Sequence, residues 1–483
     1  MDYVMGGLQP EAVFRHFEKL TTIPRESGNE QAVSDYLASF GRDLGLEVIQ
    51  EDCLNVIIKK PGTPGKESAP TVILQGHMDM VCTKLEGMDF DFEKDAIPVV
   101  VDGDYVRTNG TTLGADNGIA VAMAMAVLES KDLAHPPVTA LFTVAEETGM
   151  DGAMGLQPEN ISGDILINID SEEEGTLLAS CAGGVNSLIH LPLTYEKAEY
   201  TKAFKLGIRG LQGGHSGIEI NKNRANGLKL LGRLLEYVDR AFDVEVSDIG
   251  GGEKMNAIAK FGDVIVHVHE DVVEDFKKEV SCFEEALQNE YQTADPSLHV
   301  DIQAMDAPAD RFNDVTKHAI ITILRLIPNG VQSMSNDVEG LVESSTNLGV
   351  LTRDDKTLTF SSAIRSSVRS LKTEIALRIQ TICELLEAEH ELVADYPEWE
   401  YKVDSPIRDL MAKIWEEKYG ASIKVDAIHA GLECGLLKEK VGDIDMVSMG
   451  PNLYEVHTPG EKMSIGSVQR IYEFLVDVLG AIE

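Results

Sequence analysis

The sequence has 483 residues, of which 43% are hydrophobic, and it carries 81 acidic against 42 basic side chains, for a formal net charge of -39. This length exceeds the size at which one hydrophobic core usually stops growing, so we expect a globular protein of two domains. The negative charge repels phosphate backbones and anionic lipids, so we expect neither a nucleic-acid partner nor a membrane partner.

Sorting and redox features predict a cytoplasmic protein. The stretch MDYVMGGLQPEAVFRHFEKL lacks a basic region followed by an apolar one, so it does not read as a secretory signal. No uninterrupted apolar run reaches the roughly 18 residues that a membrane span needs. The six cysteines lie far apart without a Cys-x-x-Cys pair, which is typical of reduced cytoplasmic thiols.

From about residue 10 to 185 the chain alternates helical and strand-like patterns. A helix is predicted at about 29–43, short apolar strands at about 46–58, 70–76, 138–144 and 164–169, and an apolar helix at about 118–130. This alternation predicts an α/β domain, in which flanking helices cover both faces of a central, mostly parallel sheet.

The pattern changes beyond about 185. KAFKLGIRGLQGGHSG indicates a strand and a glycine turn, and NRANGLKLLGRLLEYVDRA has helical spacing. AKFGDVIVHVHEDVVEDFKKEVSCFEEAL and TLTFSSAIRSSVRSLKTEIALRIQTICELL each run from strand to amphipathic helix, which indicates either a duplicated module or chance similarity. We therefore predict an inserted α+β lid domain at 185–393, with two similar halves if the duplication is real. The segments 1–184 and 394–483 would form the catalytic domain and complete one sheet.

Ionisable residues recur where the predicted strands end, which is where ligands bind in open α/β sheets. These residues are His77 and Asp79 in ILQGHMDMV, Asp116 in the turn of GTTLGADNGIAVA, Glu146 and Glu147 in TVAEETGMDG, Asp170 in NIDSEEEG, and His457 in LYEVHTPGE. Imidazole and carboxylate without thiolate favour zinc, with manganese or cobalt as substitutes. Five ligands exceed the need of one catalytic zinc, so two metals sharing a carboxylate are predicted.

Each of these residues alone has an ordinary structural explanation. A histidine after a strand is commonly a hydrogen-bonded structural group, and paired glutamates commonly begin a solvated helix. Asp116 could cap a helix, and Asp170 could form a turn. Their recurrence at five strand ends favours the metal site, because desolvated carboxylates need cations nearby.

The motifs resemble those of a known enzyme family. GHMDMV, GTTLGADNGIAVA, EETGMDGA, NIDSEEEG, GGHSG, HAGLECG and VHTPGE, in this order and spacing, are similar to the dinuclear-zinc metallopeptidases that include carnosinases, aminoacylases and glutamate carboxypeptidases. HAGLECG and the lid length resemble the aminoacyl-histidine dipeptidases of this family. The resemblance covers about residues 5–480 and implies a homodimer. It also implies metal-dependent hydrolysis of dipeptides, preferentially Xaa-His, including β-alanyl-histidine.

The resemblance also implies roles in the catalytic domain. Asp116 would bridge two zinc ions, one completed by His77 and Asp170, the other by Glu147 and His457. Asp79 would orient the His77 imidazole. Glu146 would be the general base for a metal-activated water.

Further roles are implied in the lid and near the C-terminus. His215 would stabilise the transition state, although a glycine-flanked histidine is often only a turn residue. Asn256 would contact substrate, and Arg365 would receive its C-terminal carboxylate, since an arginine fork binds a carboxylate through two hydrogen bonds. Arg369, one helical turn away, is an alternative candidate for binding this carboxylate. Either arginine could instead simply form a surface salt bridge. In HAGLECG, Gly431 would lie beside the substrate, and Glu433 would contact its amino or imidazole group.

Two other functions are compatible with the sequence. A broader dipeptidase, a tripeptidase or an N-acyl-amino-acid amidohydrolase would share the metal chemistry. An inactive metal-binding scaffold or sensor is disfavoured, because such a protein has no chemical need for Glu146.

Overall fold

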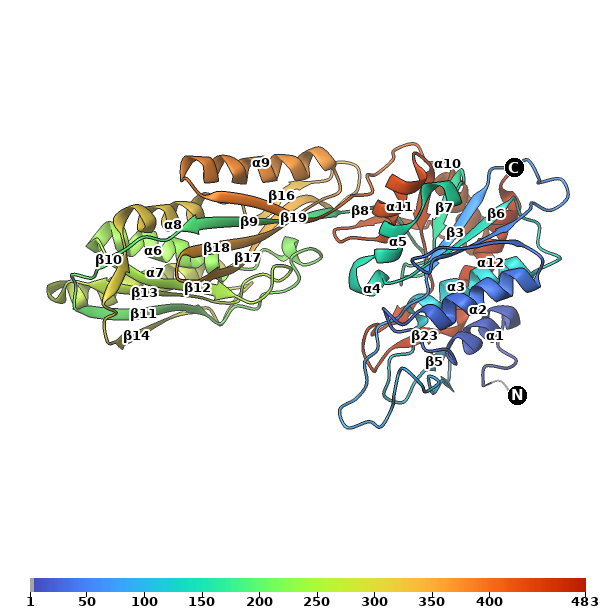
Figure 1. Cartoon of the computed structure of the whole chain (residues 1–483), viewed down its shortest axis with the longest axis horizontal. Coiled ribbons are helices and arrows are strands. Elements are labelled where there is room, and N and C mark those ends of the chain that lie inside the picture. Colours follow the sequence, from blue (N-terminus) through green and yellow to red (C-terminus); the bar gives the residue numbers. More distant parts are fainter. Residues whose placement is uncertain (1–3) are drawn as a thin grey trace. The chain divides into compact units, whose positions relative to one another are not determined.

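The computed structural model describes residues 4–483, which form two compact units (Figure 1). The first unit contains the chain up to Ser180, together with Tyr401–Ala427 and Leu432–Glu483. The second contains Cys181–Glu400 and the short segment Ile428–Gly431. Each unit has its own core of buried aliphatic and aromatic side chains.

An eight-stranded sheet forms the centre of the first unit. In spatial order its strands are β1 (Glu47–Gln50), β2 (Val56–Lys60), β6 (Val138–Thr143), β3 (Val72–His77), β7 (Ile165–Asn168), β21 (Asp445–Ser448), β8 (Thr176–Cys181) and β20 (Lys424–Ile428). Strands β6, β3, β7 and β21 are parallel, whereas β1, β2 and β8 run antiparallel to their neighbours. The predicted α/β class is confirmed, with the parallel pairing confined to the buried middle of the sheet.

Helices flank this sheet, and a small second sheet accompanies it. The helices are α1 (Glu11–Leu20), α2 (Gln31–Asp43), α3 (Ala115–Glu129), α4 (Glu146–Gly149), α5 (Asp151–Gly155), α10 (Pro406–Tyr419), α11 (Glu433–Val441) and α12 (Ile465–Ala481). The small sheet has the order β22 (Leu453–Tyr454), β23 (Lys462–Ser464), β5 (Tyr105–Arg107) and β4 (Val100–Asp102). Helix α3 is apolar nearly all round because it packs between α1 and strands β3 and β6. Within residues 4–483, no helix combines the length and apolarity that crossing a membrane requires.

The register of the parallel strands positions the predicted site. His77 pairs with Thr143, and Gln75 pairs with Asn168, so β3, β6 and β7 end at the same edge of the sheet. Whatever follows these strands therefore gathers at that edge.

The second unit is built on a long antiparallel sheet. Its strands follow the order β14 (His299–Met305), β11 (Lys202–Arg209), β13 (Gly262–Val268), β12 (Glu245–Gly252), β17 (Val342–Arg353), β18 (Thr357–Ser366), β9 (Gly183–Pro192) and β19 (Glu389–Tyr396), with β16 (Gly330–Met334) paired to β17. Its long helices, which pack on the sheet, are α6 (Gly227–Phe242), α7 (Val273–Tyr291), α8 (Asp314–Leu326) and α9 (Arg369–Leu385). Strands β10 (Tyr195–Lys197) and β15 (Asp310–Phe312) form a separate pair.

This unit consists of two halves with one topology. In chain order each half runs strand-helix-strand-strand-helix-strand: the first is β11-α6-β12-β13-α7-β14 and the second is β9-α8-β17-β18-α9-β19. Across the sheet, each half has the same spatial order, in which the fourth strand of the half lies next to its first, followed by its third and then its second. Strands β12 and β17 pair antiparallel and join the halves into one sheet. The two similar sequence stretches correspond to β13-α7 and β18-α9, which are equivalent positions, so the predicted two-half architecture is confirmed.

Candidate metal centre

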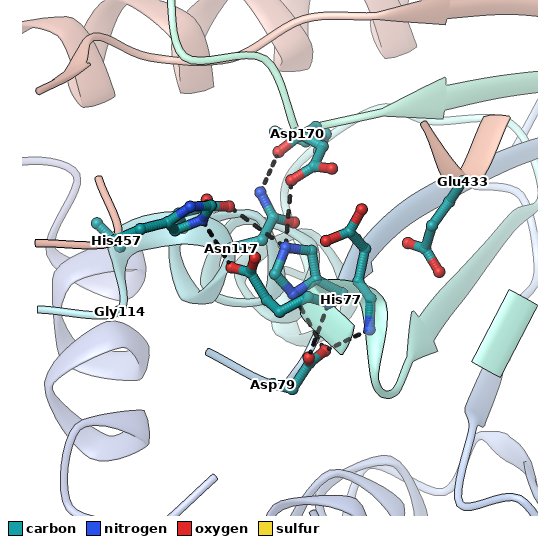
Figure 2. Close-up of polar contacts among 12 residues, drawn as sticks. His77, Asp79, Gly114, Asn117, Asp170, Glu433 and His457 are labelled. Carbon is teal, nitrogen blue, oxygen red and sulfur yellow. Dashed lines mark hydrogen bonds and ion pairs between the residues drawn. The ribbon is translucent and has the colours of Figure 1, made fainter. Parts of the chain in front are cut away.

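Two histidines and three carboxylates gather in the first unit beyond the ends of β3, β6 and β7 (Figure 2). Asp116 lies between the histidines, because its Oδ1 is 3.3 Å from His77 Nε2 and its Oδ2 is 3.0 Å from His457 Nε2. Asp170 Oδ1 lies 3.4 Å from His77 Nε2, and Glu147 Oε1 lies 3.0 Å from His457 Nε2. The set thus divides into two groups that share Asp116, each with one imidazole and one further carboxylate.

Local backbone conformation delivers these side chains. His77 is the last residue of β3 and is 1% exposed. Asp116 departs from helical geometry at the start of α3, with φ -80° and ψ 108°. Gly114, two residues earlier, has φ +69°, and a Cβ there would lie 2.7 Å from Met80 Sδ, so this tight turn requires glycine. The sequence Leu113–Asp116 can therefore bring a carboxylate back over the sheet edge.

Asp79 connects the His77 imidazole to the glutamates that follow β6. Its Oδ1 lies 3.2 Å from His77 Nδ1, and its carboxylate accepts the backbone N–H groups of Glu146 and Glu147 at 3.2 and 3.3 Å. The Ser27 hydroxyl donates to Asp79 Oδ2 at 2.8 Å. Burial opposes ionisation, but these hydrogen bonds and the His77 charge lower the pKa of Asp79. Asp79 therefore stays ionised and fixes two elements of the site at once.

Two further carboxyl groups lie at this edge: Glu433 is fully buried, and Glu146 is half-buried. Burial, together with the nearby charges of Asp170, Glu433 and Glu147, raises the pKa of Glu146 to about 9, although His77 opposes the shift. Burial likewise raises the pKa of Glu433 to about 7. Glu433 Oε2 accepts from Gln75 and Thr143 at 2.6 and 2.9 Å, whereas its buried Oε1 has no hydrogen-bond partner within residues 4–483. Bound cations would lower both pKa values, since positive charge favours the carboxylate form.

The other predicted residues, His215, Asn256, Arg365 and Gly431, belong to the second unit. The Ser216 N–H donates to the Asn256 carbonyl at 2.9 Å, which holds Asn256 next to the His215 turn. Asn256 and Arg365 line one cavity of about 320 Å³. Gly431 ends the segment Ile428–Gly431. Within the second unit, the structure thus brings His215, Asn256 and Arg365 near one another.

The hydrogen bonds of His215 define its tautomer. Its Nδ1 accepts the N–H groups of Gly217 and Ile218, both at 3.2 Å, so the proton of a neutral ring sits on Nε2. Burial and the charge of Arg365 lower the pKa of His215, which keeps the ring neutral. His215 can therefore act as a hydrogen-bond donor through Nε2–H.

The two candidate arginines have different surroundings. Arg369 Nε lies 2.8 Å from Glu398 Oε1, which is the ion pair considered as its structural explanation. Arg365 donates through Nη1 to the Tyr396 hydroxyl at 2.9 Å, and no carboxylate of the described chain lies within ion-pair distance of it. Arg365 is thus the arginine with capacity for an external carboxylate.

Comparison with known proteins places this geometry in a family. The sequence model of Peptidase family M20/M25/M40 matches residues 73–481. The chain belongs to this peptidase family. It is 36% identical over 477 residues to the cytosol non-specific dipeptidase of Escherichia coli (strain K12), a match that covers 98% of each protein. The predicted class is confirmed: the protein is a metallopeptidase, a hydrolase.

Solved structures agree with the family assignment. The crystal structure of aminoacylhistidine dipeptidase from Vibrio alginolyticus is 37% identical, has a TM-score of 0.95, and matches over 99% of this chain and 98% of that one. Aminopeptidase PepT from Bacillus cereus ATCC 10987 shares the fold at 15% identity and a TM-score of 0.57, over 99% and 100% of the two chains.

The donor set of this M20 peptidase fits divalent metal ions. His77, Asp116 and Glu147 each offer one atom within 4.8 Å of the others. Asp170 Oδ1 is buried and, apart from its 3.4 Å approach to His77 Nε2, has no hydrogen-bond partner in the described residues, as expected of a ligand atom whose partner is a cation. Imidazole nitrogen and carboxylate oxygen suit zinc, manganese or cobalt.

Sequence reasoning missed two charged residues that support these donors. Glu461 accepts the backbone N–H groups of Leu113, Gly114, Ala115 and Asp116. Arg25 is 2% exposed and donates to the carbonyls of Met78, Asp79 and Gly114. Glu461 lies inside the motif VHTPGE, four residues after His457, and that proximity was the available signal. Arg25 lies in an irregular stretch, TTIPRESG, whose pattern indicates no role.

Proposed function

We propose that this M20 peptidase is a cytoplasmic, homodimeric dinuclear-zinc dipeptidase that cleaves Xaa-His dipeptides, including β-alanyl-histidine. The observation that carries the proposal is the placement of the two Asp116 oxygens, one facing His77 and the other facing His457. A carboxylate placed in this way could serve both members of a pair of metal ions. In this proposal His77, Asp116 and Asp170 would hold one zinc, and Asp116, Glu147 and His457 would hold the other.

The proposed chemistry assigns one proton path to Glu146. Bound zinc would supply Lewis acidity, which polarises the scissile carbonyl and lowers the pKa of water toward about 7. The Glu146 carboxylate takes a proton from the attacking water and later gives it to the nitrogen of the leaving amine. Such general acid–base catalysis typically contributes about 10²- to 10⁴-fold. Asp79 holds the Glu146 backbone through its N–H, so the base is oriented by the same carboxylate that orients His77.

Other side chains bind the substrate in this proposal. His215 donates its Nε2–H to the oxygen that becomes negative as the carbonyl is attacked. Arg365 and Asn256 receive the C-terminal carboxylate, Gly431 lies along the substrate backbone, and Glu433 Oε1 accepts from the substrate amino group. A carboxylate clamp limits the enzyme to short peptides, because a longer peptide cannot end at Arg365.

A broader dipeptidase is the second candidate, because of the cavity that contains Arg365. Its lining consists of Gly184, Val185, Asn186, Met255, Asn256, Ala363, Ile364, Arg365 and Tyr396. It contains no acidic side chain that would select an imidazolium group. The E. coli relative is named a non-specific dipeptidase, whereas the V. alginolyticus relative is named an aminoacylhistidine dipeptidase.

A substrate panel separates these candidates. Release of the C-terminal amino acid is measured for β-alanyl-histidine, alanyl-histidine, other dipeptides, tripeptides and N-acetylated amino acids. Metal-stripped protein is compared with protein restored with zinc or manganese. Glu146→Gln is the test variant, and Glu159→Gln, at an exposed position of the same unit, is the matched control.

We expect metal-dependent cleavage that favours Xaa-His, is lost in Glu146→Gln and persists in Glu159→Gln. Equal cleavage of many dipeptides would support the metal-dependent mechanism but would favour the broader dipeptidase over the Xaa-His dipeptidase. Preferential cleavage of N-acetylated amino acids would indicate the amidohydrolase instead. The absence of hydrolysis from protein with two metal ions bound would overturn the proposal and favour a metal-binding scaffold.

A further inference from the structure

Three neighbouring strands of the second unit align Tyr396, Gly184 and Arg365 in one row. Strand β9 lies between β18 and β19, and its Gly184 pairs with Arg365 on one side and with Tyr396 on the other. Directly paired residues of adjacent antiparallel strands point to the same face of the sheet. Tyr396 and Arg365 are therefore on the same face, two strands apart.

Gly184 allows the tyrosine to reach across the intervening strand. A Cβ at Gly184 would lie 2.5 Å from both Cζ and the hydroxyl oxygen of Tyr396. Any side chain at this position would thus displace the phenol ring. With glycine there, the ring crosses β9, and its hydroxyl accepts a hydrogen bond from Arg365 Nη1 at 2.9 Å.

The backbone around Tyr396 is fixed in the conformation that aims the ring. The pairing of β19 with β9 shifts register between Val393 and Tyr396, and Ala394 in this bulge has φ +53°. Bulges of this kind redirect the side chains that follow them. Lys372 Nζ then donates to the Tyr396 carbonyl at 2.9 Å and to Asp395 Oδ1 at 2.7 Å. These contacts hold the backbone from which the phenol extends toward Gly184.

The guanidinium that this hydroxyl touches has unused hydrogen-bonding capacity. Arg365 Nε is buried without an acceptor, and the chain from residue 4 onward supplies Arg365 with no carboxylate partner. Arg365, Asn256 and Tyr396 all line the 320 Å³ cavity. Since buried donors of a charged group are costly to leave unpaired, this cavity suits an anionic oxygen ligand.

The hydroxyl of Tyr396 can also donate. Its oxygen accepts the Arg365 hydrogen bond, and its own proton remains available. Burial raises the pKa of Tyr396, against the opposing charge of Arg365, so the phenol keeps this proton at neutral pH. A carboxylate bound to Arg365 would accept from the guanidinium and from the phenol together.

We propose that Tyr396 is a substrate-binding residue of the carboxylate clamp: it orients Arg365 and donates its hydroxyl proton to the C-terminal carboxylate of the dipeptide, and Gly184 leaves the space that makes this contact available. The proposal rests on the carboxylate-binding role proposed for Arg365 above.

A double-mutant cycle on the full-length, zinc-loaded protein tests the contact. KM and kcat for alanyl-histidine are measured for wild type, Tyr396→Phe, Arg365→Met and the double variant. Phenylalanine keeps the ring over Gly184 and removes only the hydroxyl. Tyr237→Phe is the matched control, because the Tyr237 hydroxyl bonds Glu279 at an exposed position of the same unit. Thermal unfolding verifies that every variant is folded.

We expect Tyr396→Phe to raise KM about 10- to 100-fold, the range for one hydrogen bond to a charged group, with kcat changed little. In the Arg365→Met background the same substitution should have a much smaller effect, because both side chains bind one carboxylate. Gly184→Ala should raise KM although it retains the hydroxyl, since the methyl group displaces the ring. Tyr237→Phe should match wild type.

The outcomes distinguish this inference from the proposed function. If Arg365→Met leaves KM unchanged, the carboxylate clamp of the proposed function is wrong. If Arg365→Met raises KM but Tyr396→Phe does not, only the role of Tyr396 is wrong. A full effect of Tyr396→Phe in the Arg365→Met background, or a loss confined to kcat, would also overturn the inference.

Discussion

Replacement of Glu461 by glutamine should destabilise the turn that carries Asp116. Glu461 is 2% exposed, and each of its oxygens accepts two consecutive backbone N–H groups. Oε2 accepts from Leu113 and Gly114 at 2.7 and 3.0 Å, and Oε1 accepts from Ala115 and Asp116 at 2.8 and 3.4 Å. In Glu461→Gln one oxygen remains, and the new NH₂ group faces two N–H donors that then have no acceptor.

The hydrogen bonds and the burial of the charge set the magnitude. Two buried N–H groups left without acceptors cost about 1–3 kcal/mol each, or about 2–6 kcal/mol together. Burial raises the pKa of Glu461 despite its N–H partners, which means that burying its negative charge is unfavourable. Removing that charge in Glu461→Gln therefore offsets part of the free energy lost with the hydrogen bonds. We therefore expect Glu461→Gln to lower the free energy of unfolding by an amount at the lower end of this range, about 2–3 kcal/mol. Because the turn positions Asp116, zinc affinity should fall about tenfold or more.

Urea unfolding followed by circular dichroism measures the stability change, and competition with a chromogenic chelator measures zinc affinity. Glu455→Gln is the matched control, because Glu455 lies in the same loop, exposed, at 3.7 Å from Lys462 Nζ. The exposed pair should contribute less than about 1 kcal/mol. Equal stability and equal zinc affinity of the two variants would refute the argument that Glu461 holds the Asp116 turn.

Three further outcomes are expected. Gly214→Ala should lower kcat/KM, because Gly214 has φ +137° and a Cβ there would lie 2.7 Å from Glu219 Oε2 beside His215. Gly330 has φ +84° and nothing within 4 Å of its Cβ position, so the control Gly330→Ala should leave kcat/KM unchanged. Equal kcat/KM in the two variants would contradict this prediction. Burial, with Arg325 nearby, lowers the pKa of Lys229 from 10.5 to about 7, so the unfolded state binds more protons and stability rises with pH between about 7 and 10.5. Lys229 Nζ also donates to the Ile327 carbonyl, so the informative quantity is the pH trend: the stability of Lys229→Met relative to wild type should be greatest below pH 7 and should fall toward pH 10.5 in calorimetry, and a pH-independent difference would oppose the assignment. Chelation of metal should lower the thermal midpoint, and added zinc should restore it in proportion to the logarithm of its concentration; a midpoint insensitive to zinc would count against a site at His77 and His457.

The sequence was informative where function depends on local position along a strand. His77, Glu147 and Asp170 follow short apolar segments that are parallel strands in the structure, and the parallel register alone brings their ends to one edge. Asp79 is two residues from His77 on the same strand end, so its contact with the imidazole was predictable from strand geometry. The repeated strand-helix pattern likewise predicted the two halves of the second unit.

Contacts between distant segments were not predictable in this way. Glu461 reaches the Leu113–Asp116 turn from 345 or more residues away, and Arg25 crosses to Met78 and Gly114, because the small sheet and the α1–α3 packing bring those segments together. From the sequence alone, Glu461 and Arg25 are indistinguishable from ordinary charged surface residues; only the folded structure shows that they are buried. Tyr396 is a similar case, since its reach to Arg365 depends on Gly184 in a strand more than 180 residues earlier, which is a matter of sheet order.

The sequence by itself determined the residue types and the strand-end positions of the metal donors, because strand periodicity and turn chemistry act over a few residues. The tertiary structure decided which oxygen of Asp116 faces which histidine, which buried charges hold the turns in place, and that Arg365 rather than Arg369 is without a carboxylate partner among the described residues. Those facts depend on sheet order, register and burial, which arise only when segments far apart in the chain pack together.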